Sequence, residues 1–345
     1  MKYKPFIFGM AIFCIAFFYL SIQQMRFIIA EKSCDLDSSK NKLALAESSK
    51  QALFYNKHNP LYYLNTGCYY AQVDSIDSKI ITRLVQDRSI ELHYMDSSYK
   101  YISEAYKMYP EEPIFALNFS LIELFKGNSN NSIKVLEPFI NNTEDNNLEL
   151  LCVLGLGYET IGKTESAINT YSLAVSHLPE IIRSDFFKEL KYRDSLMAIK
   201  ILDSAETILQ REYYSTKDPM VSSRLGSLMF EIGDLDRAEY YLFEAVNDLP
   251  SLNRPWYYLG LIKQMKGDDG AINYFVKSHY LDRTDMLPVR IMVSYGEPYQ
   301  DLLDYLKQNK SSSQSQKISR LFNGSTMRYP YLIADLEQYL RIKDI

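Results

Sequence analysis

The chain has 345 residues, of which 47% are apolar and 29 are tyrosine, and its formal net charge at pH 7 is −5. This is enough apolar material for a substantial buried core. The sequence pI of about 5.6 and the lack of any run of lysine or arginine argue against a nucleic-acid partner, because proteins that bind the phosphate backbone usually display a basic stripe.

The N-terminal segment differs in kind from the rest of the chain. A basic tail over residues 1–4, with Lys2 and Lys4, precedes an uncharged stretch from Pro5 to Ile22. As a helix that rises about 1.5 Å per residue, this stretch would span about 27 Å, close to the thickness of a bilayer core. We predict a transmembrane signal-anchor over residues 5–25. A cleaved signal peptide is the alternative, but the run is long for one and no A-x-A site follows directly.

A short basic tail before a first apolar segment is typical of export signals. The number of basic residues on each side does not favour an N-terminus that stays inside, because Arg26 and Lys32 follow the segment. We nevertheless expect a single-pass membrane protein with the rest of the chain on the exported side, which in a bacterium is the periplasm.

Two stretches further along the chain carry the same residue types at the same spacing. The first has Leu154-Gly155, Gly162, Ala167, Tyr171, Ala174 and Pro179, and the second has Leu225-Gly226, Gly233, Ala238, Leu242, Ala245 and Pro250. A third copy begins about 34 residues after Gly226, with Trp256, Leu259-Gly260 and Gly267. The period, the W-x2-L-G pattern and the closing proline resemble the tetratricopeptide repeat.

The resemblance implies an all-α fold, a right-handed solenoid of stacked helix hairpins. Clear repeats cover 148–181, 219–252 and 253–284, degenerate ones cover 43–110 and 111–145, and the solenoid as a whole runs over 40–285. A long insertion near Asp74 to Arg88 interrupts the first degenerate unit. The segment from Ser184 to Tyr214 has a helical pattern but carries few of the repeat's residues.

Each recurring position of the repeat pattern has a physical role. Gly155, Gly226 and Gly260 lie on first helices, where the lack of a Cβ allows a neighbouring helix to approach closely. Ala167 and Ala238 open second helices and allow the same close packing. Gly162, Gly233 and Gly267 fall where first helices end, because glycine tolerates the left-handed conformation found there. We therefore expect a neighbouring helix to lie close to each glycine of the first set.

The C-terminal region, residues 286–345, is expected to hold further helices. Residues 310–316 (KSSSQSQ) read as a polar linker. A helix over 330–342 follows, with Pro330 in its first turn and an apolar stripe of Leu332, Leu336, Tyr339 and Leu340. A cap on the last repeat is the favoured role for this helix, and a partner-docking helix is the alternative.

The sequence offers no pattern for catalysis, a metal or a cofactor, so we predict a non-enzymatic protein. His177 and His279 fall at the ends of second helices, where a helix dipole suits them. Asp234 and Asp268 lie in turns without the glutamate that would complete a calcium loop, and are read as turn or N-cap residues. Cys34 and Cys68 either pair in an oxidising compartment or remain free thiols.

By the same resemblance, the first helices line a concave groove for a partner protein or peptide. The residues that should face inward are Glu149, Cys152, Leu156, Glu159, Thr160, Met220, Ser223, Ser227, Phe230, Glu231, Arg254, Tyr257, Leu261, Gln264 and Met265. We expect a membrane-anchored scaffold, with a role in cell-envelope assembly. The alternative is an accessory of surface-polysaccharide assembly that contacts a glycan through exposed tyrosines such as Tyr257.

Overall fold

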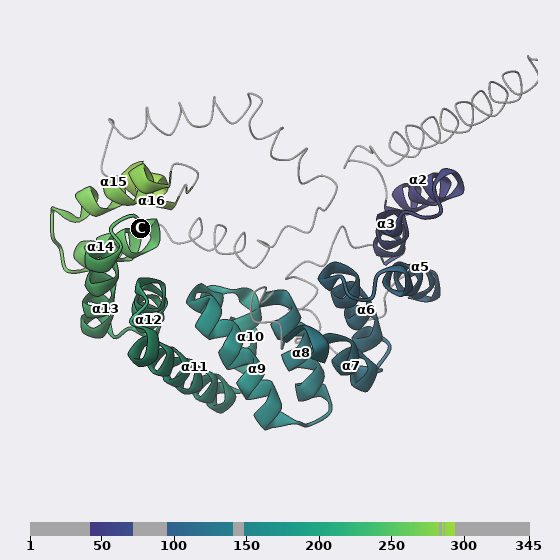
Figure 1. Ribbon diagram of the computed structural model, residues 1–345, viewed down its shortest axis with the longest axis horizontal. Coiled ribbons are helices and arrows are strands. Elements are labelled where there is room, and N and C mark those ends of the chain that lie inside the picture. Colours follow the sequence, from purple (N-terminus) through teal and green to yellow (C-terminus); the bar gives the residue numbers. More distant parts are fainter. Residues whose placement is uncertain (1–41, 72–94, 141–147, 283–284, 286, 294–345) are drawn as a thin grey trace, which may run out of the picture. The chain divides into compact units, whose positions relative to one another are not determined.

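The computed structural model describes residues 42–71, 95–140, 148–282, 285 and 287–293 (Figure 1). The secondary structure within these ranges is helical and contains no strand. The chain divides into two compact units, Met1–Asp77 with Ser89–Val135 and Ser78–Arg88 with Leu136–Ile345. Each unit is described by itself below.

The first unit contains the helices α2 (Lys42–Tyr55), α3 (Pro60–Tyr70), α5 (Met95–Met108) and α6 (Pro113–Phe125), and the start of α7 (Ser129–Ile140). The helix α3 packs against α2 on one side and α5 on the other, and α5 packs against α6. Asn59 caps α3 by accepting a hydrogen bond from the Leu61 N–H at 3.0 Å. The first turn of α3 therefore begins with a capped Asn-Pro pair, as helix N-termini commonly do.

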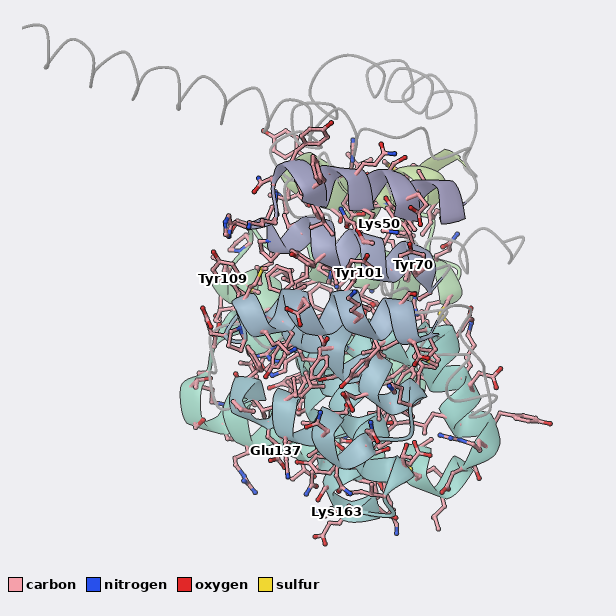
Figure 2. All side chains as sticks on the ribbon, turned by 90° about the vertical axis from the view of Figure 1, so that its right-hand side faces the viewer. Lys50, Tyr70, Tyr101, Tyr109, Glu137 and Lys163 are labelled. Atoms are coloured by element: carbon pink, nitrogen blue, oxygen red, sulfur yellow. The ribbon has the colours of Figure 1, made fainter. Side chains whose placement is uncertain are left out.

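The contact between α3 and α5 joins segments on either side of the predicted insertion. A Cβ added to Gly67 would lie 2.5 Å from Ile102 Cγ1 and 3.1 Å from the Ile102 backbone nitrogen. Tyr70 of α3 and Tyr101 of α5 stack with ring centroids 5.7 Å apart and ring planes 13° apart (Figure 2). The two helices thus form a hairpin of repeat type, although residues 72–94 separate them in the chain.

The second unit contains three helix pairs in the predicted repeats: α8 (Leu148–Thr160) with α9 (Thr164–His177), α12 (Pro219–Ile232) with α13 (Leu235–Asp248), and α14 (Asn253–Met265) with α15 (Ala271–Leu281). The members of each pair lie side by side in Figure 1. Gly233 ends α12 with φ of 92°, and Asp234 N–H donates to the Met229 carbonyl at 2.9 Å. This is the left-handed helix end that the repeat glycines predict.

The predicted close approach of a neighbouring helix to each first-helix glycine is confirmed in all three pairs, and that helix is the second helix of the same pair. A Cβ on Gly226 would lie 2.6 Å from Leu242 Cγ, and a Cβ on Gly260 would lie 2.7 Å from Phe275 Cε1. A Cβ on Gly155 would collide with the Tyr171 ring. Since real Cβ atoms do not approach other atoms this closely, any larger residue would push the two helices of a pair apart.

The segment with few repeat residues forms η1 (Pro179–Arg183), α10 (Asp185–Arg193) and the long helix α11 (Ser195–Thr216). The helix α11 packs against α9, α10 and α12, and η1 packs against α9, α10 and α12. The buried face of α10 consists of Phe186, Phe187 and Leu190, and the buried face of α11 includes Ile201 and Ala205. After the last pair, α16 (Leu287–Val293) packs on α15.

Several predicted features lie outside the described residues: the basic tail at 1–4, the signal-anchor at 5–25, the linker at 310–316 and the capping helix at 330–342. Among the described helices, none combines the length and the apolar character needed to cross a bilayer.

Candidate functional site

The predicted partner-facing residues all fall on first helices of the three pairs, five each on α8, α12 and α14. Their exposure varies widely. Seven are buried, namely Glu149, Cys152, Leu156, Ser223, Ser227, Tyr257 and Leu261. Glu159, Phe230, Glu231, Arg254 and Gln264 are half-buried, and Thr160, Met220 and Met265 are exposed.

On α12 and α14, the face around Glu231 and Arg254 is contacted by the chain's own η1. Arg183 of η1 forms a two-point ion pair with Glu231, with Nε to Oε2 at 2.7 Å and Nη2 to Oε1 at 2.5 Å. Glu180 of η1 pairs with Arg254 of α14 at 2.8 Å. The two predicted groove residues therefore have intramolecular partners of opposite charge, which come from the segment after α9.

Tyr258 joins these two ion pairs. Its hydroxyl oxygen lies 3.0 Å from Glu180 Oε1 and 3.1 Å from Glu231 Oε1. A phenol has one hydrogen to donate, so it satisfies only one of the two carboxylates at a time. Burial raises the pKa of Glu231, although the Arg183 guanidinium acts in the opposite direction. If one of the two carboxyl groups were protonated, its O–H could donate to the Tyr258 oxygen, and both contacts would then be hydrogen bonds.

The predicted face on α8 is also engaged within the chain. Glu159 pairs with Arg193 of α10 at 2.8 Å and accepts a hydrogen bond from the Tyr171 hydroxyl at 3.3 Å. Burial raises the pKa of Glu149 to about 7, and burial together with the nearby Glu149 raises the pKa of the Cys152 thiol. Cys152 is a free thiol in this interior, and such a thiol is inert toward most reagents.

Three exposed apolar residues that the repeat pattern does not mark lie close together in sequence, at the end of α10 and in the first turns of α11. Tyr192, Leu196 and Ile199 expose 90%, 61% and 54% of their surface, respectively. Lys191 and Lys200 flank them and are exposed. We call these five residues the junction patch. Sequence reasoning missed it because the segment carries few repeat residues, and only the burial of Met197, Ala198 and Ile201 beside it reveals which face points outward.

The polar residues that resemble ligands in the sequence have structural roles. Asp234 Oδ1 caps α13 by accepting from Arg237 N–H at 3.1 Å, and Asp268 Oδ1 accepts from Gly270 N–H at 2.8 Å. The described residues contain no group of three or more His, Cys, Asp or Glu placed to hold a metal ion. His177 is partly buried, and burial and then Arg224 lower its pKa, which works against the cation that the helix dipole would favour.

Cys68 is a buried free thiol whose Sγ lies 3.5 Å from Asn118 Oδ1. Burial raises its pKa to about 12. Cys34, its predicted alternative partner, lies outside the described residues.

No known protein-family profile matches the chain, and no curated protein matches it either. Solved tetratricopeptide repeat structures are similar to it. A tetratricopeptide repeat protein from Parabacteroides merdae shares 15% identity over 78% of this chain and 98% of that one, with a TM-score of 0.34. YrrB, described as a TPR protein with an unusual peptide-binding site, shares 12% identity over 71% and 98%, with a TM-score of 0.28.

MamA is similar as well, with 17% identity over 55% of this chain and 90% of that one and a TM-score of 0.24. These identities are low and the superpositions loose, so they carry no functional conclusion. The fold is defined by the hairpin contacts themselves, in which pairs of helices close on a glycine.

Proposed function

We propose that this protein is a non-catalytic scaffold that binds a partner protein or peptide through its helical hairpins. The junction patch is the observation that carries the proposal. Tyr192, Leu196 and Ile199 expose large apolar surfaces, while the opposite faces of α10 and α11 supply the buried residues that hold these helices in place. Apolar side chains that the fold does not need are typical of interaction surfaces, where tyrosine is enriched.

The surroundings of the patch indicate the chemistry of the partner. Lys191 and Lys200 are exposed at its edges. Asp194 and Asp203 are exposed beside it as well. A complementary partner would present an apolar stripe bordered by charged residues of both signs, as an amphipathic helix does.

The proposal extends to the membrane and the cell envelope. The apolar stretch at 5–25 would hold the scaffold to a bilayer, with the hairpins on the exported side. Proteolysis of intact cells and of spheroplasts tests the orientation: exported hairpins are cut in spheroplasts, whereas hairpins that stay protected until lysis contradict it. The glycan alternative has no support from Tyr257, because this residue is only 3% exposed and offers no ring face for a sugar to stack on.

The partner can be tested by co-purification of the full chain after mild detergent extraction and in native lipid. We expect a stoichiometric partner that is lost when Leu196→Glu and Ile199→Glu are combined. Val276→Glu is the matched control, because Val276 of α15 is an exposed apolar residue away from the patch in sequence. Recovery of the bare protein in both media, or equal loss with Val276→Glu, would contradict the proposal.

A further inference from the structure

Glu244 of α13 differs from the other glutamates of α11 and α13 in having no counter-ion. The two helices carry four glutamates. Three of them form ion pairs with arginine or lysine, namely Glu206 with Arg237, Glu212 with Arg224, and Glu239 with Lys263 and Lys266. Within the part of the chain that the structure describes, no lysine or arginine pairs with Glu244, which is half-buried. Its negative charge is therefore left for something else to balance.

Two tyrosine hydroxyls hold the Glu244 carboxylate in place. Tyr213 of α11 donates to its Oε2 at 2.5 Å, and Tyr240 of α13 donates to its Oε1 at 2.8 Å. These hydrogen bonds are the largest cause that raises the pKa of both phenols, so both remain protonated donors at neutral pH. Neutral donors orient a carboxylate without cancelling its charge, so the site still favours a cation.

The rings of these tyrosines belong to a cluster of four that joins α11 to α13. Tyr213 contacts Tyr214 and Tyr241 edge to face, with ring centroids 5.2 and 5.4 Å apart, and Tyr241 contacts Tyr240 in the same way at 5.1 Å. We call these residues the tyrosine cluster. Tyr213 and Tyr241 are buried, whereas Tyr214 and Tyr240 expose 66% and 56% of their surface. An exposed ring thus lies beside the Glu244 carboxylate, on Tyr240.

The cluster already accommodates one cation, from the chain itself. Lys217 ends α11 in the left-handed conformation, and its ammonium lies 4.0 Å from the centroid of Tyr213 and 5.1 Å from that of Tyr214. These distances are those of cation–π contacts. Among the described residues, no cation lies over the ring of Tyr240, although this ring is exposed and adjoins the carboxylate.

The composition of the site argues against other ligand classes. An anion would meet repulsion from Glu244, and a purely apolar partner would bury this carboxylate without a counter-charge, which is costly. One carboxylate is a poor donor set for a divalent metal ion. A sugar needs free hydroxyl groups to bond with, and those of Tyr213 and Tyr240 are already used by Glu244.

We propose that Glu244 and the exposed ring of Tyr240 bind a single arginine or lysine side chain of a peptide partner. The cation of that side chain donates to the carboxylate and lies against the ring. A polybasic segment fits less well, because Lys217 and Arg237 lie nearby. This inference rests on the proposed function, since it takes the partner to be a protein or peptide, and it adds a recognition element separate from the junction patch.

Saturation-transfer NMR of the full chain in a non-ionic detergent detects such weak binding. The probes are blocked tripeptides with arginine or lysine between two glycines, and the corresponding norleucine peptide, which lacks the charge. We expect both basic peptides to bind with a Kd of about 1 mM and the norleucine peptide to bind at least about 5-fold more weakly. No transfer to either basic peptide, or equal binding of the norleucine peptide, overturns the proposal. Tighter binding of free choline than of both peptides overturns it as well, because the ligand would then not be a peptide.

Variants locate the binding site. Glu244→Gln keeps the shape and removes the charge, so we expect the affinity for the basic peptides to fall about 5-fold or more. Tyr240→Leu removes the exposed ring and should weaken binding by about 2- to 5-fold; it carries the test if Glu244→Gln does not fold. Asp203→Asn, the same loss of charge at an exposed position of α11, should leave binding unaltered. Unchanged affinity in Tyr240→Leu and in any folded Glu244→Gln, or an equal loss in Asp203→Asn, contradicts the proposal.

Tyr192→Leu separates this inference from the proposed function. It removes an exposed ring of the junction patch, and we expect the basic peptides to bind this variant as they bind the wild type. Loss of peptide binding in Tyr192→Leu would place the basic side chain on the junction patch and overturn the assignment to Glu244. If no peptide binds the wild type, this inference fails alone, because co-purification of a partner with the full chain tests the junction patch independently.

Discussion

Arg183 on η1 and Glu231 at the end of α12 form a two-point ion pair in the interior of the second unit. Both side chains are largely buried. The pair links the segment after α9 to the first helix of the next repeat, so part of the predicted groove is contacted by the chain itself. The pair also makes a direct prediction about stability.

Arg183→Met should destabilise the second unit by about 3 kcal/mol near pH 8, because it leaves the Glu231 carboxylate buried without its counter-ion. The loss should be smaller at pH 5, where Glu231, whose pKa burial already raises, can take up a proton. Urea unfolding at both pH values measures this. Adding Glu231→Gln should recover part of the loss. Lys188→Met, which breaks the exposed pair with Asp185, is the control and should cost under about 1 kcal/mol. Equal losses for Arg183→Met and Lys188→Met would contradict the buried pair.

Glu149 should make the second unit less stable as the pH rises. Its ordinary pKa is 4.5, and burial raises the pKa in the folded state to about 7. Between these values the folded state holds a proton that the unfolded state has lost, so stability is highest below about pH 4.5 and falls until about pH 7, by about 3 kcal/mol. The difference in unfolding free energy between wild type and Glu149→Gln isolates this effect. A difference that does not vary with pH would mean that Glu149 titrates normally.

The contact between Gly67 and Ile102 predicts a strong coupling across the insertion. Gly67→Ala should cost about 1–3 kcal/mol by overpacking, part of it offset by the better helix propensity of alanine. Ile102→Ala alone should cost about 2–5 kcal/mol as a cavity. Because the removed Cγ1 is the atom that the new Cβ would meet, the double variant should be more stable than the sum predicts, by about 0.5–3 kcal/mol. Additive losses in chemical denaturation would show that α3 and α5 do not pair.

Cys68 and Cys152 should resist maleimide in the native protein. Both are buried, and burial raises the pKa of both thiols, so little reactive thiolate forms at neutral pH. Mass spectrometry of peptides should find both labelled only after denaturation. If Cys68 stays unlabelled in denaturant until a reductant is added, it forms a disulfide, and pairing with Cys34 becomes the explanation.

Much of the helical architecture could be predicted from local patterns. The spacing of Gly226, Gly233 and Leu242 encodes a first helix, its end and its contact with the second helix, because each property depends on side-chain size or backbone freedom at one position. The pairing of α3 with α5 was harder to predict, because the insertion places more residues between Gly67 and Ile102 than lie between the corresponding residues of the other pairs.

The candidate site was less predictable. A repeat pattern indicates which helix a residue occupies, but it does not show what else packs on that helix. Glu231 and Arg254 were expected to face a partner, and in the structure they pair with Arg183 and Glu180. Those partners come from a segment that carries few repeat residues, so no spacing in the sequence connects them.

The sequence by itself determined the helix pairs and their closure on glycine, because the steric fit between neighbouring helices depends on residues that are close along the chain. Only the tertiary structure decided which polar groups are paired in the interior, as in the network on η1, and which apolar side chains face outward, as in the junction patch. These features depend on distances between side chains from separate elements, and such distances arise only when the hairpins pack together.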